Sequence, residues 1–149
     1  MMRFPYDMLV VATAIVFHFL IAGILVTQKH GKLRLFRLFS AAWFALIVPL
    51  GVLFATALLR GAPTKTVIQY GFVFLYMGVE FLLDIVSKFD FRSRWVTHVP
   101  YILLEYAALF SLLGLARDIS RLAGFLVLGC LLVVMAAVAY VLIPRRSHA

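Results

Sequence analysis

The sequence predicts an all-α, polytopic integral membrane protein, folded as a compact bundle of five transmembrane helices. Of its 149 residues, 65% are hydrophobic and only 13% charged, and the mean hydropathy is +1.08. Soluble domains average about 45–50% apolar and about 25% charged residues. The apolar residues also gather into stretches close to the roughly 20 residues that cross a bilayer. We therefore expect a single transmembrane helical domain over residues 1–149.

The first two spans are expected over residues 8–28 and 38–59. The first has a longer apolar core than a cleaved signal peptide, whose core is about 7–15 residues, and the basic segment QKHGKLRLFR follows it. It is therefore predicted to stay as a membrane helix. Pro49 lies within the second span, where it removes a backbone hydrogen bond and predicts a kink.

The remaining three spans are expected over residues 66–86, 98–116 and 122–144. Gly61 and Pro63 mark a turn before the third span. The fourth span is the shortest and is interrupted by Glu105. The polar segment LARDISRLAG connects it to the fifth, which ends at Pro144.

The basic residues predict orientation rather than nucleic-acid binding. The net charge is +8, but Lys and Arg stand between apolar runs instead of following one groove. Nine of these residues lie in the loops after the first and third spans and in the C-terminal tail: Lys29, Lys32, Arg34, Arg37, Lys88, Arg92, Arg94, Arg145 and Arg146. The other side has five: Arg3, Arg60, Lys65, Arg117 and Arg121. Because Lys and Arg are enriched in cytoplasmic loops, we expect an outside N-terminus and a cytoplasmic C-terminus in a cell membrane. The expected partners are membrane lipids and, as alternatives, a second copy or a larger membrane complex.

Four ionisable residues fall within the predicted spans: His18, Glu80, Asp84 and Glu105. A charged Asp, Lys or Arg at a helix centre costs about 2.5–3.5 kcal/mol on insertion scales, so such residues usually face a bundle or a cavity. Glu80 and Glu105 are nearly equidistant along the chain from Ser93, in the middle of the loop between their spans. Antiparallel neighbours joined by a short loop would place both carboxyl groups at about one depth. His18 falls in a similar slab of the membrane.

Two polar stripes accompany these carboxyl groups. On the third span Tyr76, Glu80 and Asp84 recur every four residues, which places neighbouring members on adjacent parts of one face. On the fourth span Tyr101 and Glu105 share a face with His98. We expect the two stripes to face each other, because polar contacts aid helix association in lipid.

Such carboxyl groups could share a proton, bind a cation or hold an amine-bearing ligand. With His18 they could also bind zinc, manganese or iron. A packing role is the alternative, with protonated Glu80 and Glu105 hydrogen-bonded to Tyr76, Tyr101 or Tyr106.

The leading hypothesis is proton- or cation-linked transport, or ligand binding, through Glu80 and Glu105, with support from His18, Asp84, Tyr76 and Tyr101. The alternatives are an accessory subunit of a membrane complex and an intramembrane lipid-modifying enzyme. The sequence contains no Gly-rich phosphate loop, HExxH or GxSxG motif, and its single cysteine excludes an intrachain disulfide. It identifies no cofactor.

Overall fold

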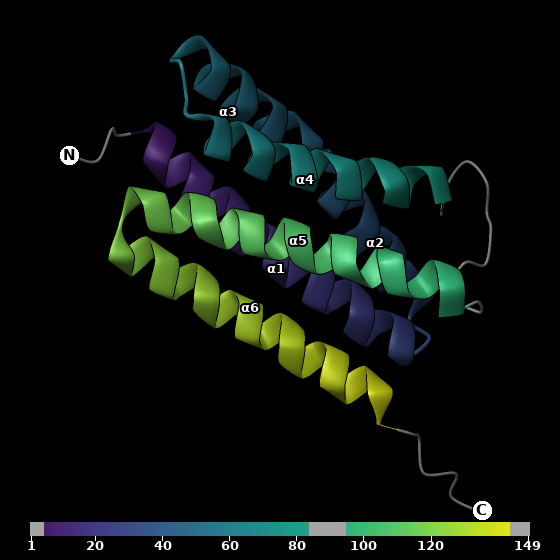
Figure 1. Ribbon diagram of the computed structural model, residues 1–149. Coiled ribbons are helices and arrows are strands. Elements are labelled where there is room, and N and C mark those ends of the chain that lie inside the picture. The colour runs from purple at the N-terminus through teal and green to yellow at the C-terminus, as the bar shows by residue number, and fades with distance from the viewer. Residues whose placement is uncertain (1–4, 84–94, 144–149) are drawn as a thin grey trace, which may run out of the picture.

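The computed structural model describes residues 5–83 and 95–143, and within these ranges it forms six helices and no strand. They are α1 (Tyr6–Lys29), α2 (Leu33–Ala45), α3 (Ile47–Leu59), α4 (Thr64–Glu80), α5 (Trp95–Ile119) and α6 (Arg121–Leu142). Because α2 and α3 together form one apolar segment, the described residues contain five segments that are long and apolar enough to cross a membrane. The predicted fold class, an all-helical transmembrane bundle, is confirmed. The start of α1 and the end of α6 lie at opposite ends of the bundle (Figure 1).

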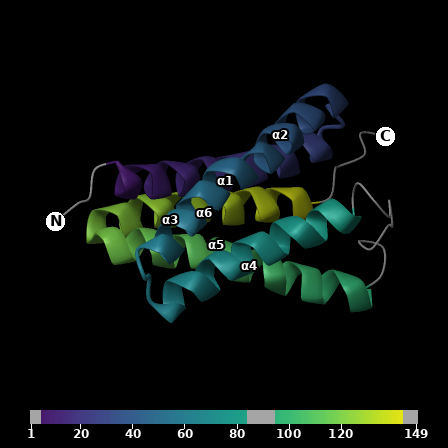
Figure 2. The ribbon, with the colours of Figure 1, turned by 90° about the horizontal axis from the view of Figure 1, so that it is seen from above.

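The kink predicted at Pro49 is present as a break between α2 and α3 at Leu46. Proline has no N–H, so the carbonyl of Ala45 loses the partner it would have in a continuous helix. The break is a tight turn, in which the N–H of Leu46 donates to the carbonyl of Trp43 at 3.1 Å. Figure 2 shows that α2 and α3 run obliquely across the other helices.

The connections between helices are short and use the residues that suit tight turns. Gly31 and Gly61 have φ of 67° and 65°, a left-handed conformation that glycine adopts without steric cost. They close the α1–α2 and α3–α4 connections. Ser120 alone separates α5 from α6, and its hydroxyl accepts a hydrogen bond from the N–H of Ala123 at 3.0 Å, which caps α6.

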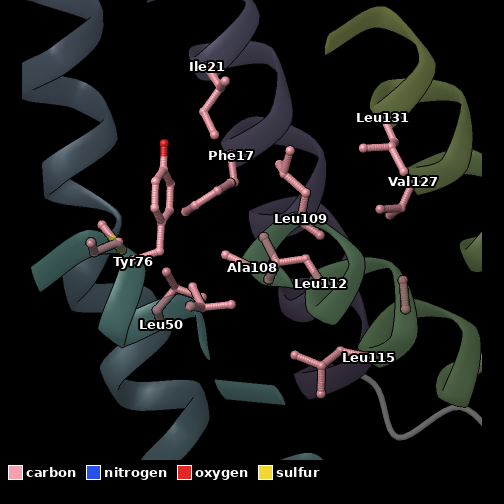
Figure 3. Packing of buried hydrophobic residues seen from close by; sticks show 14 of the residues in the cluster. Phe17, Ile21, Leu50, Tyr76, Ala108, Leu109, Leu112, Leu115, Val127 and Leu131 are labelled. Atoms are coloured by element: carbon pink, nitrogen blue, oxygen red, sulfur yellow. The ribbon is translucent and has the colours of Figure 1, made fainter. Parts of the chain in front are cut away.

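Apolar side chains fill the interior and also cover the exterior. Helix α1 contacts α2, α3, α5 and α6, and α5 contacts α1, α4 and α6. Their facing surfaces are fully buried, as Phe17 of α1 and Leu109 and Leu112 of α5 show in the core (Figure 3). Yet large apolar residues such as Phe125 are 70% exposed. An apolar surface on both sides is expected when lipid is the solvent.

Gly114 of α5 leaves room for the side-chain amide of Gln69 on α4. A Cβ atom added at Gly114 would overlap with the side-chain amide of Gln69 on α4. The same atom added at Gly129, on α6, would meet nothing within 4 Å. The two glycines therefore differ in packing although both lie within helices.

We predict that Gly114→Ala leaves the bundle less stable than Gly129→Ala does, because the added methyl group must displace the Gln69 amide. Overpacking typically costs about 1–3 kcal/mol, while Ala itself favours a helix over Gly by about 1 kcal/mol. The double variant Gln69→Ala/Gly114→Ala should recover the stability lost, because the overlapping amide is gone. Chemical unfolding of each variant in mild detergent measures these differences. Equal stability of the two single variants would contradict the expected cost of displacing the Gln69 amide.

Candidate functional site

The polar faces of α4 and α5 meet through two tyrosines. The hydroxyl groups of Tyr76 and Tyr101 are 3.2 Å apart, and both residues are buried. The side chain of Tyr101 is also hydrogen-bonded to Glu80. Tyr76 can thus donate to Tyr101 while Tyr101 donates to the Glu80 carboxyl group, which gives a continuous hydrogen-bonded chain from α4 to α5 and back.

An aromatic row links these tyrosines to two other helices. The ring of Trp43, on α2, lies 5.5 Å from Tyr76 and 5.3 Å from Phe17 of α1, centroid to centroid. Tyr76 and Tyr101 are 5.7 Å apart by the same measure. These separations are typical of favourable aromatic pairs. The row therefore connects α1, α2, α4 and α5 at the level of the candidate site.

A cavity of about 640 Å³ adjoins the tyrosine pair. Five helices form its walls: the second half of α1, the ends of α4 and α6, the first part of α5, and α2. The cavity therefore lies in the half of the bundle drawn on the right in Figure 1. The polar and aromatic residues of the lining are Gln28, Lys29, Trp43, Tyr76, Glu80, Tyr101, Glu105 and Tyr106. The two carboxyl-bearing residues predicted to share one depth thus line the same cavity. Both are partly buried.

Backbone geometry changes directly after Glu80. Residues 81–83 continue the helix with a wider, π-type turn. Such turns insert an extra residue into the helical repeat and are frequent at functional sites. Glu80 therefore occupies the last regular position of α4.

Lys29 lies at the end of the cavity where α1 and α6 finish. Its ammonium group donates to the carbonyl oxygens of Tyr140 and, at 2.9 Å, of Ile143. It also lies 4.1 Å from the centre of the Tyr140 ring. These contacts place the charge of Lys29 at the negative end of the α6 dipole and join the C-terminal ends of α1 and α6.

His18 is fully buried but does not line the cavity. Its Nδ1 atom is 2.7 Å from the carbonyl oxygen of Ala14 one turn earlier, and its Nε2 atom has no hydrogen-bond partner among the described residues. In residues 5–83 and 95–143, no three His, Cys, Asp or Glu side chains are close enough to hold one metal ion. The part of the chain that is described therefore gives no support to a metal site built on His18.

Two predicted site residues cannot be placed, and two residues of the cavity lining were not predicted to belong to the site. Asp84 lies outside the described residues, and nothing is described of the His98 side chain. Trp43 and Lys29 line the cavity, although the sequence marked Lys29 only as a loop cation. No signal in the sequence places Trp43 beside Tyr76, because that contact depends on how α2 crosses α4.

Trp43 supplies a buried polar group to the cavity wall. The residue is 2% exposed, and its indole N–H has no hydrogen-bond partner in the part of the chain that the structure describes. An unsatisfied buried donor costs about 1–3 kcal/mol, so such groups usually receive a partner from water, an ion or a ligand.

Comparison with models of protein families, with curated proteins and with solved structures found no match.

We predict that Tyr101→Phe destabilises the protein by about 1 kcal/mol, since it removes the hydroxyl group that bridges Tyr76 and Glu80. Tyr76→Phe and Tyr101→Phe should be non-additive, because each variant breaks the same hydrogen bond. A double-mutant cycle by chemical unfolding in detergent gives the coupling. Tyr140→Phe is the control, since its hydroxyl bonds to His30 at an exposed position. Strict additivity of the Tyr76 and Tyr101 substitutions would contradict the hydrogen-bonded pair.

Proposed function

We propose that this protein binds a positively charged species, a proton or a cation, inside the membrane and takes part in its transport. The observation that supports the proposal is the placement of Glu80 and Glu105 on the wall of one cavity within an otherwise apolar bundle. Carboxyl groups within membrane spans are costly and commonly mark proton or ion pathways. A bound cation or a shared proton would offset the repulsion between two such groups.

The aromatic surroundings of the carboxyl groups fit this role. Tyr76, Tyr101 and Tyr106 line the cavity together with Glu80 and Glu105. A tyrosine hydroxyl can donate to an ionised carboxylate and accept from a protonated carboxyl group. The site can therefore keep its hydrogen bonds in both charge states, which a carrier of protons or cations requires.

We further propose that the protein resides in a cell membrane with its N-terminus outside. The five apolar segments support membrane residence. The excess of Lys and Arg in the segments after the first and third spans and in the C-terminal tail supports the orientation. On this orientation the cavity lies in the cytoplasmic half of the bundle.

An accessory subunit of a larger membrane complex is the second candidate. The described connections α1–α2, α3–α4 and α5–α6 are three, four and one residue long, too short to close over the cavity as a lid. Gly71 and Gly78 also leave open space on the exposed face of α4, where another transmembrane helix could approach closely. Purification from native membranes distinguishes the two, because an accessory subunit should emerge with a fixed partner.

We predict that Glu105→Gln and Glu80→Gln remove a cation response that the wild-type protein has. In mild detergent at constant ionic strength, one cation of a panel containing sodium, potassium and ethylammonium should raise the unfolding temperature of the wild type. A ligand at about 100 times its Kd stabilises by about 2.7 kcal/mol, which such a scan resolves. In proteoliposomes, the same substitutions should abolish the flux of that cation or of protons.

Asp118→Asn is the matched control. It also removes one carboxylate, but Asp118 pairs with Lys65 at 2.7 Å at an exposed position outside the cavity. This variant should keep the cation response and the flux. The proposal fails if the Glu80 and Glu105 variants match the wild type in every cation response and every flux.

A further inference from the structure

The cavity that contains Glu80 and Glu105 has two chemically different parts. The carboxyl and aromatic groups come from α4, α5 and α2, whereas α1 and α6 contribute mainly aliphatic side chains. The aliphatic lining residues are Ile21, Ile24, Leu25, Ile102, Val138, Val141, Leu142 and Ile143. A site divided in this way suits a ligand that has a polar end and an apolar end.

The polar part is suited to an ammonium group. An ammonium group has up to three N–H donors and no acceptor, and the carboxyl groups of Glu80 and Glu105 supply acceptors. Tyr76, Tyr101 and Trp43 add aromatic rings to the same wall, and aromatic rings attract cations through their faces. A bound ammonium group would thus meet carboxyl groups and aromatic side chains together.

Lys29 does not oppose this arrangement, because its ammonium group is directed to the end of α6. It donates to the carbonyl oxygens of Tyr140 and Ile143 and lies over the Tyr140 ring. Its charge is therefore engaged where α6 ends, at the aliphatic side of the cavity. The Lys29 ammonium group is thus directed away from the part of the cavity that Glu80 and Glu105 line.

The size of the cavity argues against a bare ion as the whole ligand. Its volume of about 640 Å³ falls within the range of about 300–1,000 Å³ that is typical of sites for drug-sized molecules. The aliphatic walls on α1 and α6 offer contacts to a hydrocarbon chain that a proton or a metal ion would not use.

We propose that the cavity binds an amphiphilic amine, with its ammonium group between Glu80 and Glu105 and its hydrocarbon chain along α1 and α6. This inference rests on the proposed function and specifies its substrate class. Such an amine reaches the site either dissolved in the bilayer or from the aqueous phase. The shared chemistry is one ammonium group on one apolar tail.

Trp43 provides the reporter for the test. The chain has two tryptophans, Trp43 and Trp95, so Trp95→Phe leaves Trp43 as the only one. In phosphatidylcholine nanodiscs, Trp43 emission is followed while dodecylamine, dodecanol, hexylamine or methylamine is added, with each concentration corrected for partition into the bilayer. Dodecylamine should bind at least tenfold more tightly than dodecanol and than methylamine. Binding of dodecylamine alone identifies a bilayer source, and binding of hexylamine as well identifies an aqueous source.

Two variants in the single-tryptophan background locate the two ends of the ligand. Glu105→Gln should weaken dodecylamine at least tenfold, and the control Asp118→Asn should leave it unchanged. Val138→Phe narrows the aliphatic part without touching the carboxyl groups, so it should weaken dodecylamine but not methylamine. This second variant keeps the test decisive if Glu105→Gln fails to fold.

The inference is overturned if dodecanol binds as tightly as dodecylamine, or if Val138→Phe leaves dodecylamine binding unchanged. A different result would separate the inference from the proposed function. If methylamine and dodecylamine bind with equal affinity and Glu105→Gln loses both, the ligand is not an amphiphile, but the cation site of the proposed function remains. If Glu105→Gln keeps both amine binding and the cation response, the inference and the proposed function are both overturned.

Discussion

The hydrogen bond between Tyr76 and Tyr101 is the contact on which the arrangement of the polar groups depends. Helices α4 and α5 each carry a glutamate in an apolar span, where a charged side chain without a polar partner is costly. The tyrosine pair, 3.2 Å apart, joins the two polar faces, and Tyr101 extends the bonding to Glu80. Once these faces are paired, Glu80 and Glu105 must lie on the same side of the α4–α5 hairpin, where they line one cavity.

The aromatic row transmits this constraint to the rest of the bundle. Trp43 can pack between Tyr76 and Phe17 only if α2 crosses obliquely beside α1 and α4. Helix α2 ends at Ala45, and the turn at Leu46, three residues before Pro49, separates it from α3. Trp43 therefore lies in the last turn of α2, from which it reaches the cavity wall.

The sequence predicted those features that depend on spacing within one helix or one hairpin. Apolar length predicted the spans, and the four-residue recurrence of Tyr76 and Glu80 with the matching depth of Glu105 predicted that α4 and α5 present polar groups to each other. Contacts between distant segments could not be predicted in this way. Trp43 and Lys29 reach the cavity through the crossing of α2 and the meeting of α1 with α6. His18 matches the carboxyl groups in depth but lies outside the cavity, because depth does not determine direction around the helix axis.

The two kinds of carboxyl group in this protein illustrate what the site is suited to do. Asp118, at an exposed position, forms an ion pair with the ammonium group of Lys65 at 2.7 Å. Glu80 receives a hydrogen bond from Tyr101, whose neutral hydroxyl can donate to an ionised carboxylate and accept from a protonated carboxyl group. The binding site that we propose needs this tolerance, because it takes up and releases a positive charge. A tyrosine beside Glu80 therefore suits the proposed site in both of its charge states.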